Sequence, residues 1–76
     1  FRVQGLTGMM GSKLLIFNRY GVKVWHDETL QDDEPELVWD GRYMNGDDVP
    51  DGHYQWVLIR ADGVRDHGSL HVFRAR

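Results

Sequence analysis

The stretch GHYQWVLIR, residues 52–60, is the clearest strand signal in this chain of 76 residues. Its large side chains follow a period of two, which places Tyr54, Trp56 and Leu58 on one face of an extended segment. No apolar period of 3.6 residues persists for two helical turns anywhere in the sequence. The pattern therefore predicts a β-protein in which this strand is half-buried against a core.

Turn signals bound that strand and separate it from further strands. The turn 49–52, with Pro50 and Gly52, introduces it and Asp62-Gly63 follows it, and these residues favour tight reversals because proline fixes φ and glycine accepts a positive φ. Residues 1–6 and 68–73 are the expected first and last strands. Several short strands with turns between them predict an all-β, immunoglobulin-like antiparallel β-sandwich of about six to eight short strands.

A second reversal lies within IFNRYGVKVW, residues 16–25. Asn18 and Gly21 are ordinary turn residues, but a turn does not require the large cation and aromatic ring of Arg19-Tyr20 at its tip. The expected strands of this hairpin are 13–17 and 22–26.

The register of this hairpin has two alternatives. We favour a three-residue loop because it uses Gly21 in the left-handed conformation, and a four-residue loop is the other possibility. The first opposes Ile16 to Val24 and Leu15 to Trp25, and the second opposes Phe17 to Val22 and Leu15 to Val24.

Composition excludes several classes of protein. The chain has no cysteine, which excludes disulfides, thiolate metal sites and cysteine nucleophiles. The longest apolar runs, 14–17 and 56–59, are far too short to cross a bilayer as helices. The length predicts one domain, 1–76, and a start without an initiator methionine or leader predicts that it is a domain excised from a longer protein.

Charge is segregated along the chain, although the net charge is only −3. Residues 27–51 contain ten acidic residues and one basic residue, Arg42, for a net charge of −9, and the remainder carries +6. A surface polarised in this way would orient a charged partner, and solvated acidic loops are the alternative. The pI of about 5.7 and the lack of a dense basic stripe argue against a nucleic-acid partner.

Candidate catalytic or metal-binding residues are sparse. His67 and His71 are four residues apart, a spacing that converges on a helix but not along a strand. The acidic residues between 32 and 48 supply hard oxygens for calcium, but the spacing of a calcium-binding loop is absent. Neither Ser12 nor Ser69 lies in a nucleophile motif. We therefore expect a non-catalytic domain with no metal and no cofactor.

Aromatic residues provide an alternative function. Trp25, Tyr43 and Tyr20 are candidates for a stacking platform in a small carbohydrate-binding or structural adhesin module. Trp39 and Trp56 are expected in the core instead, because a domain without disulfides depends on such large apolar side chains. An exposed, coplanar row of rings would favour the carbohydrate-binding interpretation.

Four short motifs follow one another along the chain: Ile16-Phe17-Asn18-Arg19-Tyr20-Gly21, Trp39-Asp40-Gly41, Pro50-x-Gly52-x-Tyr54, and Gly68 followed by Val72-Phe73-Arg74. In this order and spacing they resemble the gliding-motility-associated C-terminal domain, the type B sorting domain of the type IX secretion system. The resemblance runs essentially from residue 1 to residue 76.

The resemblance implies a C-terminal address on an exported cargo of a Bacteroidota cell. It implies passage through the periplasm, recognition by the outer-membrane translocon and a PorP-like protein, and a cargo that is secreted or held at the cell surface. It implies no catalysis, cofactor or transmembrane segment, and we expect the isolated domain to be a monomer. The expected recognition residues are Asn18, Arg19, Tyr20, Gly21, Arg74 and Arg76, and the expected structural motif residues are Trp39, Asp40, Gly41, Gly52, Tyr54 and Gly68.

Recognition by the tip has two alternatives. In the first, Arg19 makes an ion pair with the acidic segment 27–36 and Tyr20 covers a sheet edge, so that the tip has a purely structural role. The edge of the final strand offers a second mode of binding, in which a partner strand pairs with it.

Overall fold

The fold is described by a computed structural model, which covers residues 1–4, 8, 10–29 and 36–73. The described residues form six strands: β1 (Arg2–Gln4), β2 (Lys13–Asn18), β3 (Lys23–Glu28), β4 (Glu36–Val38), β5 (Gly52–Ile59) and β6 (Arg65–Val72). One sheet pairs β1 with β4, and the other has the order β3-β2-β5-β6. All pairings are antiparallel, which confirms the predicted all-β sandwich.

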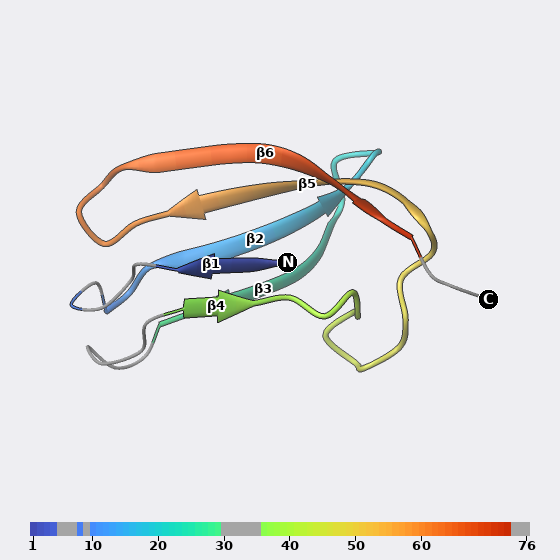
Figure 1. The fold of residues 1–76 in the computed structure, drawn as a ribbon, viewed down its shortest axis with the longest axis horizontal. Helices are drawn as coiled ribbons and strands as arrows, with labels where there is room; N and C mark the ends of the chain where they lie inside the picture. Colours follow the sequence, from blue (N-terminus) through green and yellow to red (C-terminus); the bar gives the residue numbers. More distant parts are fainter. Residues whose placement is uncertain (5–7, 9, 30–35, 74–76) are drawn as a thin grey trace.

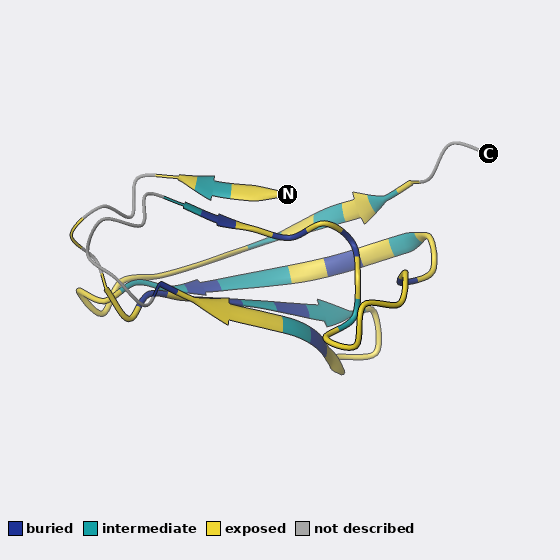
Figure 2. Ribbon diagram, turned by 90° about the horizontal axis from the view of Figure 1, so that it is seen from below, coloured by how far each residue is buried: buried dark blue, intermediate teal, exposed yellow. Residues whose placement is uncertain are grey.

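The two sheets form two layers. The β1–β4 pair lies over one face of the four-stranded sheet (Figures 1 and 2). The long strands β5 and β6 run side by side along the length of the molecule (Figure 1). Within the described residues there is no helix of the length and hydrophobicity needed to cross a membrane.

The core lies between the layers and follows the period of two. Leu14 and Ile16 of β2 are fully buried, and Tyr54 and Leu58 of β5 are almost fully buried. These residues alternate with more exposed neighbours along both strands, so each strand presents one face to the core. The remaining buried apolar residues are Val24, Leu37, Trp39 and Val49.

The hairpin of β2 and β3 has the predicted three-residue loop but a different register beyond it. Phe17 opposes Lys23, as that loop requires. A bulge then shifts the ladder by one residue, so the predicted pairs of Ile16 with Val24 and of Leu15 with Trp25 are wrong. Ile16 opposes Trp25, and Leu15 opposes His26.

The bulge has a packing reason. A bulge places two consecutive residues of one strand opposite one position of its partner and increases the local twist. Here Val24 belongs to the buried core, and Trp25, the next residue, also packs against it. Without the extra residue, strict alternation would turn one of these two apolar side chains toward solvent.

The last strand starts earlier than predicted. β6 begins at Arg65 rather than at residue 68, because the turn at Asp62-Gly63 allows the ladder to start with Ile59 opposite Arg65. The first three residues of β6 are polar and exposed, so they carry no apolar alternation. The first strand, expected over 1–6, is described over Arg2–Gln4, and residues 5 and 6 lie outside the described part of the chain.

Two buried hydroxyl residues connect three segments at the end of the four-stranded sheet opposite the β2–β3 turn. Ser12 and Thr29 are 0% and 1% exposed. The Ser12 N–H donates to Thr29 Oγ1 at 3.1 Å, and the Thr29 N–H donates to the Ser12 carbonyl at 2.9 Å. The Ser12 Oγ also accepts a hydrogen bond from the N–H of Ala61, which follows β5. Ser12, which offered no catalytic motif, is thus a structural hydrogen-bonding residue.

Replacing Ser12 with alanine is expected to lower the free energy of unfolding by about 1 kcal/mol, because the Ala61 N–H loses its partner. Urea unfolding of the purified domain measures this. Ser69→Ala, at an exposed serine of β6, is the matched control and should change stability by less than about 0.5 kcal/mol. Equal stability of the two variants would contradict the structural role of Ser12.

Candidate functional site

The turn between β2 and β3 is stabilised by its own side chain and backbone. Asn18 Oδ1 accepts hydrogen bonds from the N–H groups of Tyr20 and Val22, at 2.9 and 3.0 Å. The Asn18 N–H donates to the Val22 carbonyl, and the Gly21 N–H donates to the Asn18 carbonyl. Gly21 has a φ of 79°, which favours glycine. Asn18 and Gly21 therefore shape the turn and fix the direction in which the two residues between them project.

Arg19 and Tyr20 interact with each other at the tip. Arg19 Nη2 donates to the Tyr20 hydroxyl at 2.6 Å, and the guanidinium carbon lies 4.8 Å from the centre of the Tyr20 ring. Tyr20 is still 73% exposed. None of the ion pairs within the described residues involves Arg19, and residues 30–35 of the acidic segment lie outside that part of the chain. The tip thus presents an exposed cation on an aromatic ring.

The tip also forms one wall of a pocket of about 200 Å³. Asn18 is the direct cross-strand partner of Tyr54, which brings the turn beside the start of β5 (Figure 1). The motif 16–21 and the motif Pro50-x-Gly52-x-Tyr54 therefore meet at this pocket. Its lining residues are Asn18, Arg19, Tyr20, Tyr43, Pro50, Asp51, Gly52, His53 and Tyr54. Sequence reasoning did not identify Tyr43, Asp51 or His53 as neighbours of the tip.

Tyr54 also lines this pocket. Its hydroxyl donates to the Pro50 carbonyl at 2.7 Å, four residues upstream. A similar bond from a tyrosine hydroxyl to upstream backbone forms the tyrosine corner of immunoglobulin-like sandwiches. Gly52 between them has a φ of 152°, at the limit of the region that favours glycine. The proline, glycine and tyrosine of this motif therefore define one rigid corner.

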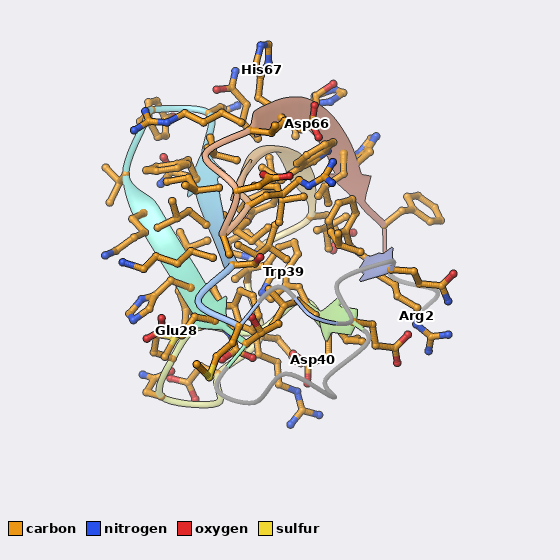
Figure 3. The ribbon with its side chains drawn as sticks, turned by 90° about the vertical axis from the view of Figure 1, so that its left-hand side faces the viewer. Arg2, Glu28, Trp39, Asp40, Asp66 and His67 are labelled. Atoms are coloured by element: carbon orange, nitrogen blue, oxygen red, sulfur yellow. The ribbon has the colours of Figure 1, made fainter. Side chains whose placement is uncertain are left out.

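Trp39 lies in the core, toward the middle of the molecule in Figure 3. It is 2% exposed, its ring centre is 5.5 Å from that of Tyr54, and its Nε1–H donates to the Arg42 carbonyl at 2.9 Å. Gly41, with a φ of 82°, turns the chain between Trp39 and Arg42. The Asp40 carboxylate lies 3.7 Å from Arg42 Nε.

Gly68, another of the predicted motif residues, does not line the pocket beside the tip; it is in β6, opposite Trp56 of β5. Arg74 and Arg76 lie outside the described residues. The candidate site that the structure describes therefore consists of the β2–β3 turn and the corner at the start of β5.

The histidines and acidic residues form no evident metal centre in the described part of the chain, where no three potential ligands are grouped. His53 and His71 oppose each other on β5 and β6, with ring centres 4.5 Å apart. His67 lies four residues before His71 on β6 and projects away from the core (Figure 3). Among the acids, Asp40 and Asp48 both lie 3.7 Å from the guanidinium of Arg42.

The aromatic residues considered for a sugar platform do not form one surface. Trp25 and Tyr43 are only partly exposed, because they pack against the core. Tyr20 is well exposed, but its contact is with Arg19. The ring pairs found among the described residues involve none of these three aromatic residues. This geometry gives no support to the carbohydrate-binding alternative.

A comparison of the chain with known protein families found a match. A family model described as the CHU_C type IX secretion signal domain matches residues 1–72. The chain belongs to this family. The match includes the tip, the corner and β6, and it confirms the resemblance seen in the four motifs. Searches of curated proteins and of solved structures found no match.

Membership of the CHU_C family places the domain in type IX secretion. The domain is a C-terminal signal of that pathway, and such signals occur on exported proteins and imply interaction with the secretion system. The family is not an enzyme family.

Proposed function

We propose that this domain is a non-catalytic address which the outer-membrane translocon and a PorP-like protein recognise, so that an upstream cargo is exported and displayed at the cell surface or released. The observation that carries the proposal is the CHU_C match over residues 1–72. The cargo would cross the inner membrane first and reach the translocon from the periplasm. The address needs a stable shape and no reactive group.

Our proposal also assigns recognition to the tip, Asn18 to Gly21, and to the arginines Arg74 and Arg76. Arginine and tyrosine are enriched among the residues that dominate the energy of protein interfaces. The turn is rigid because Asn18 makes two side-chain hydrogen bonds to it, so little conformational entropy is lost on binding. The exposed guanidinium suits a carboxylate or a carbonyl of the partner, and the adjacent pocket suits one of its side chains.

Arg19→Ala is expected to reduce export of a reporter about tenfold or more, because an interface arginine of this kind contributes upwards of about 2 kcal/mol to binding. The reporter is a fluorescent protein followed by residues 1–76. Its appearance outside a type IX-competent cell is compared with that in a translocon-deficient strain.

The matched control for Arg19 is Lys13→Ala, which removes an exposed cation from the other end of β2. It should leave export unchanged. Both variants should melt within a few degrees of the wild-type domain, since neither side chain is buried. Normal export of a well-folded Arg19→Ala reporter would refute recognition by the tip, and export of the wild type without the translocon would refute the proposed function.

A further inference from the structure

β6 is an edge strand with an open side. The order β3-β2-β5-β6 pairs it with β5 on one side, and within the described residues no strand pairs with the other side. It is eight residues long, in unbroken register with β5. An edge of this length is a template for pairing with another extended chain.

The ladder identifies the backbone groups on this open side. Hydrogen-bonded and non-hydrogen-bonded pairs alternate between antiparallel strands. The Arg60 N–H donates to the Val64 carbonyl, so the next pair, Ile59 with Arg65, is a non-hydrogen-bonded one. It follows that every second residue from Arg65 directs its N–H and C=O away from β5. These residues are Arg65, His67, Ser69 and His71.

The two edges of the same sheet are protected to different degrees. Bulges and charged residues are common devices against unwanted pairing at an edge. At the opposite edge, β3 has a bulge and carries Lys23, Asp27 and Glu28. In β6 there is no bulge, proline or lysine, and its formal charges are confined to Arg65 and Asp66 at its start. The edge at β6 is thus the one open to pairing.

Two cavities lie beside this edge, and Phe1 lines both. One, of about 280 Å³, is lined by Phe1 and by residues 39–41 and 70–73, where Phe73 is 82% exposed. The other, of about 390 Å³, has the apolar residues Phe1, Val3, Trp56 and Leu58 and the polar residues Arg2, Gln4, Arg60 and Asp66 in its lining. Asp66 and Leu70 lie four residues apart on β6, which is about 13 Å in a strand. The β1–β4 sheet has only two strands, so it leaves this part of the inner face of β6 partly uncovered (Figure 2).

We propose that the outer edge of β6 binds an extended segment of the secretion machinery by strand addition, and that two side chains of this segment, four residues apart, enter the two cavities beside Phe1. This inference rests on the proposed function, because that function supplies the partner. Unpaired N–H and C=O groups at every second residue match the backbone of an extended chain. Side chains four residues apart in such a chain point to the same face, as the two cavities require.

Proline substitution at the open side provides the test. Ser69→Pro and His67→Pro each remove one outward N–H, and proline is tolerated on an edge strand where that N–H faces solvent. The controls Ser69→Ala and His67→Ala keep the N–H. The assay uses the reporter fusion with a glycine–serine linker before residue 1, so that no cargo strand occupies the edge. We expect both proline variants to be exported about tenfold less than the alanine variants, at similar melting temperatures.

The outcomes separate this proposal from the proposed function. Normal export of the proline variants would overturn strand addition and leave the address intact. Failure of the wild-type fusion to be exported in a translocon-dependent way would overturn the proposed function and the strand proposal with it. A dimer of the purified domain that Ser69→Pro dissociates would assign the edge to a second copy and overturn the proposal. Where Ser69→Pro does not fold, His67→Pro decides by the same criterion.

Discussion

Replacing Trp39 with alanine is expected to lower the free energy of unfolding by about 3–5 kcal/mol, the usual cost of removing a buried tryptophan. The indole is 2% exposed, contacts the ring of Tyr54 and donates a hydrogen bond to the Arg42 carbonyl. Domains of ordinary size are stable by only about 5–15 kcal/mol, and a small domain without disulfides lies near the lower limit. The variant should therefore be largely unfolded at growth temperature. Thermal and urea unfolding followed by circular dichroism would measure this.

Trp25→Ala is the matched control for this prediction. Trp25 packs against the core from β3 but is only half-buried, so its removal should cost clearly less. An equal loss of stability in the two variants would contradict the assignment of Trp39 as the central residue of the core. The comparison also tests why a tryptophan precedes the Asp40-Gly41 turn, since the buried ring of Trp39 packs against Tyr54 of the corner.

Strands that bury one face were predictable from alternation alone. The face of β5 formed by Tyr54, Trp56 and Leu58 was derived from the period of two, and the structure buries two of these residues almost completely. The start of β6 was not predictable in this way, because Arg65 and the two residues after it are polar and exposed. Their place in the strand comes from pairing with β5, which no local pattern encodes.

The register of the β2–β3 hairpin shows a similar limit. Turn chemistry at Asn18 and Gly21 predicted the loop, since both residues satisfy local backbone requirements. The bulge next to Val24 depends on whether the core has room for both Val24 and Trp25, which is a property of the packed molecule. Local residues therefore determined the turn, and tertiary packing determined the pairs beyond it.

The candidate site was likewise predictable only in part. Arg19 and Tyr20 were identified from the sequence because a turn does not require such large side chains at its tip. The pocket beside them was not predicted, because it depends on the pairing of Asn18 with Tyr54 between strands far apart in the chain. The four motifs nevertheless gave indirect information about this pocket. The motif 16–21 and the motif Pro50-x-Gly52-x-Tyr54 meet at it, and Trp39 of a third motif packs against Tyr54.

Gly68 was identified as a motif residue without a structural reason, and the structure supplies one. A Cβ atom at this position would lie 2.7 Å from Cζ2 and Nε1 of Trp56, its cross-strand partner. The indole therefore lies directly over the glycine, and its other neighbour is Phe1, whose ring centre is 5.4 Å away. Gly68 is needed for space and not for an unusual backbone conformation.

Gly68→Ala is therefore expected to lower the free energy of unfolding by about 1–3 kcal/mol, the usual cost of overpacking, because the Trp56 ring must move against Phe1. The same substitution in a Trp56→Ala background should be neutral or stabilising, since alanine loses less backbone entropy than glycine in a strand. Urea unfolding of the four proteins gives this double-mutant cycle. If Gly68→Ala costs the same in both backgrounds, contact with Trp56 is not the cause. A strong coupling would instead show that the glycine serves the packing of Trp56 and Phe1, of which Phe1 lines both cavities beside the open edge of β6 and Trp56 lines one of them.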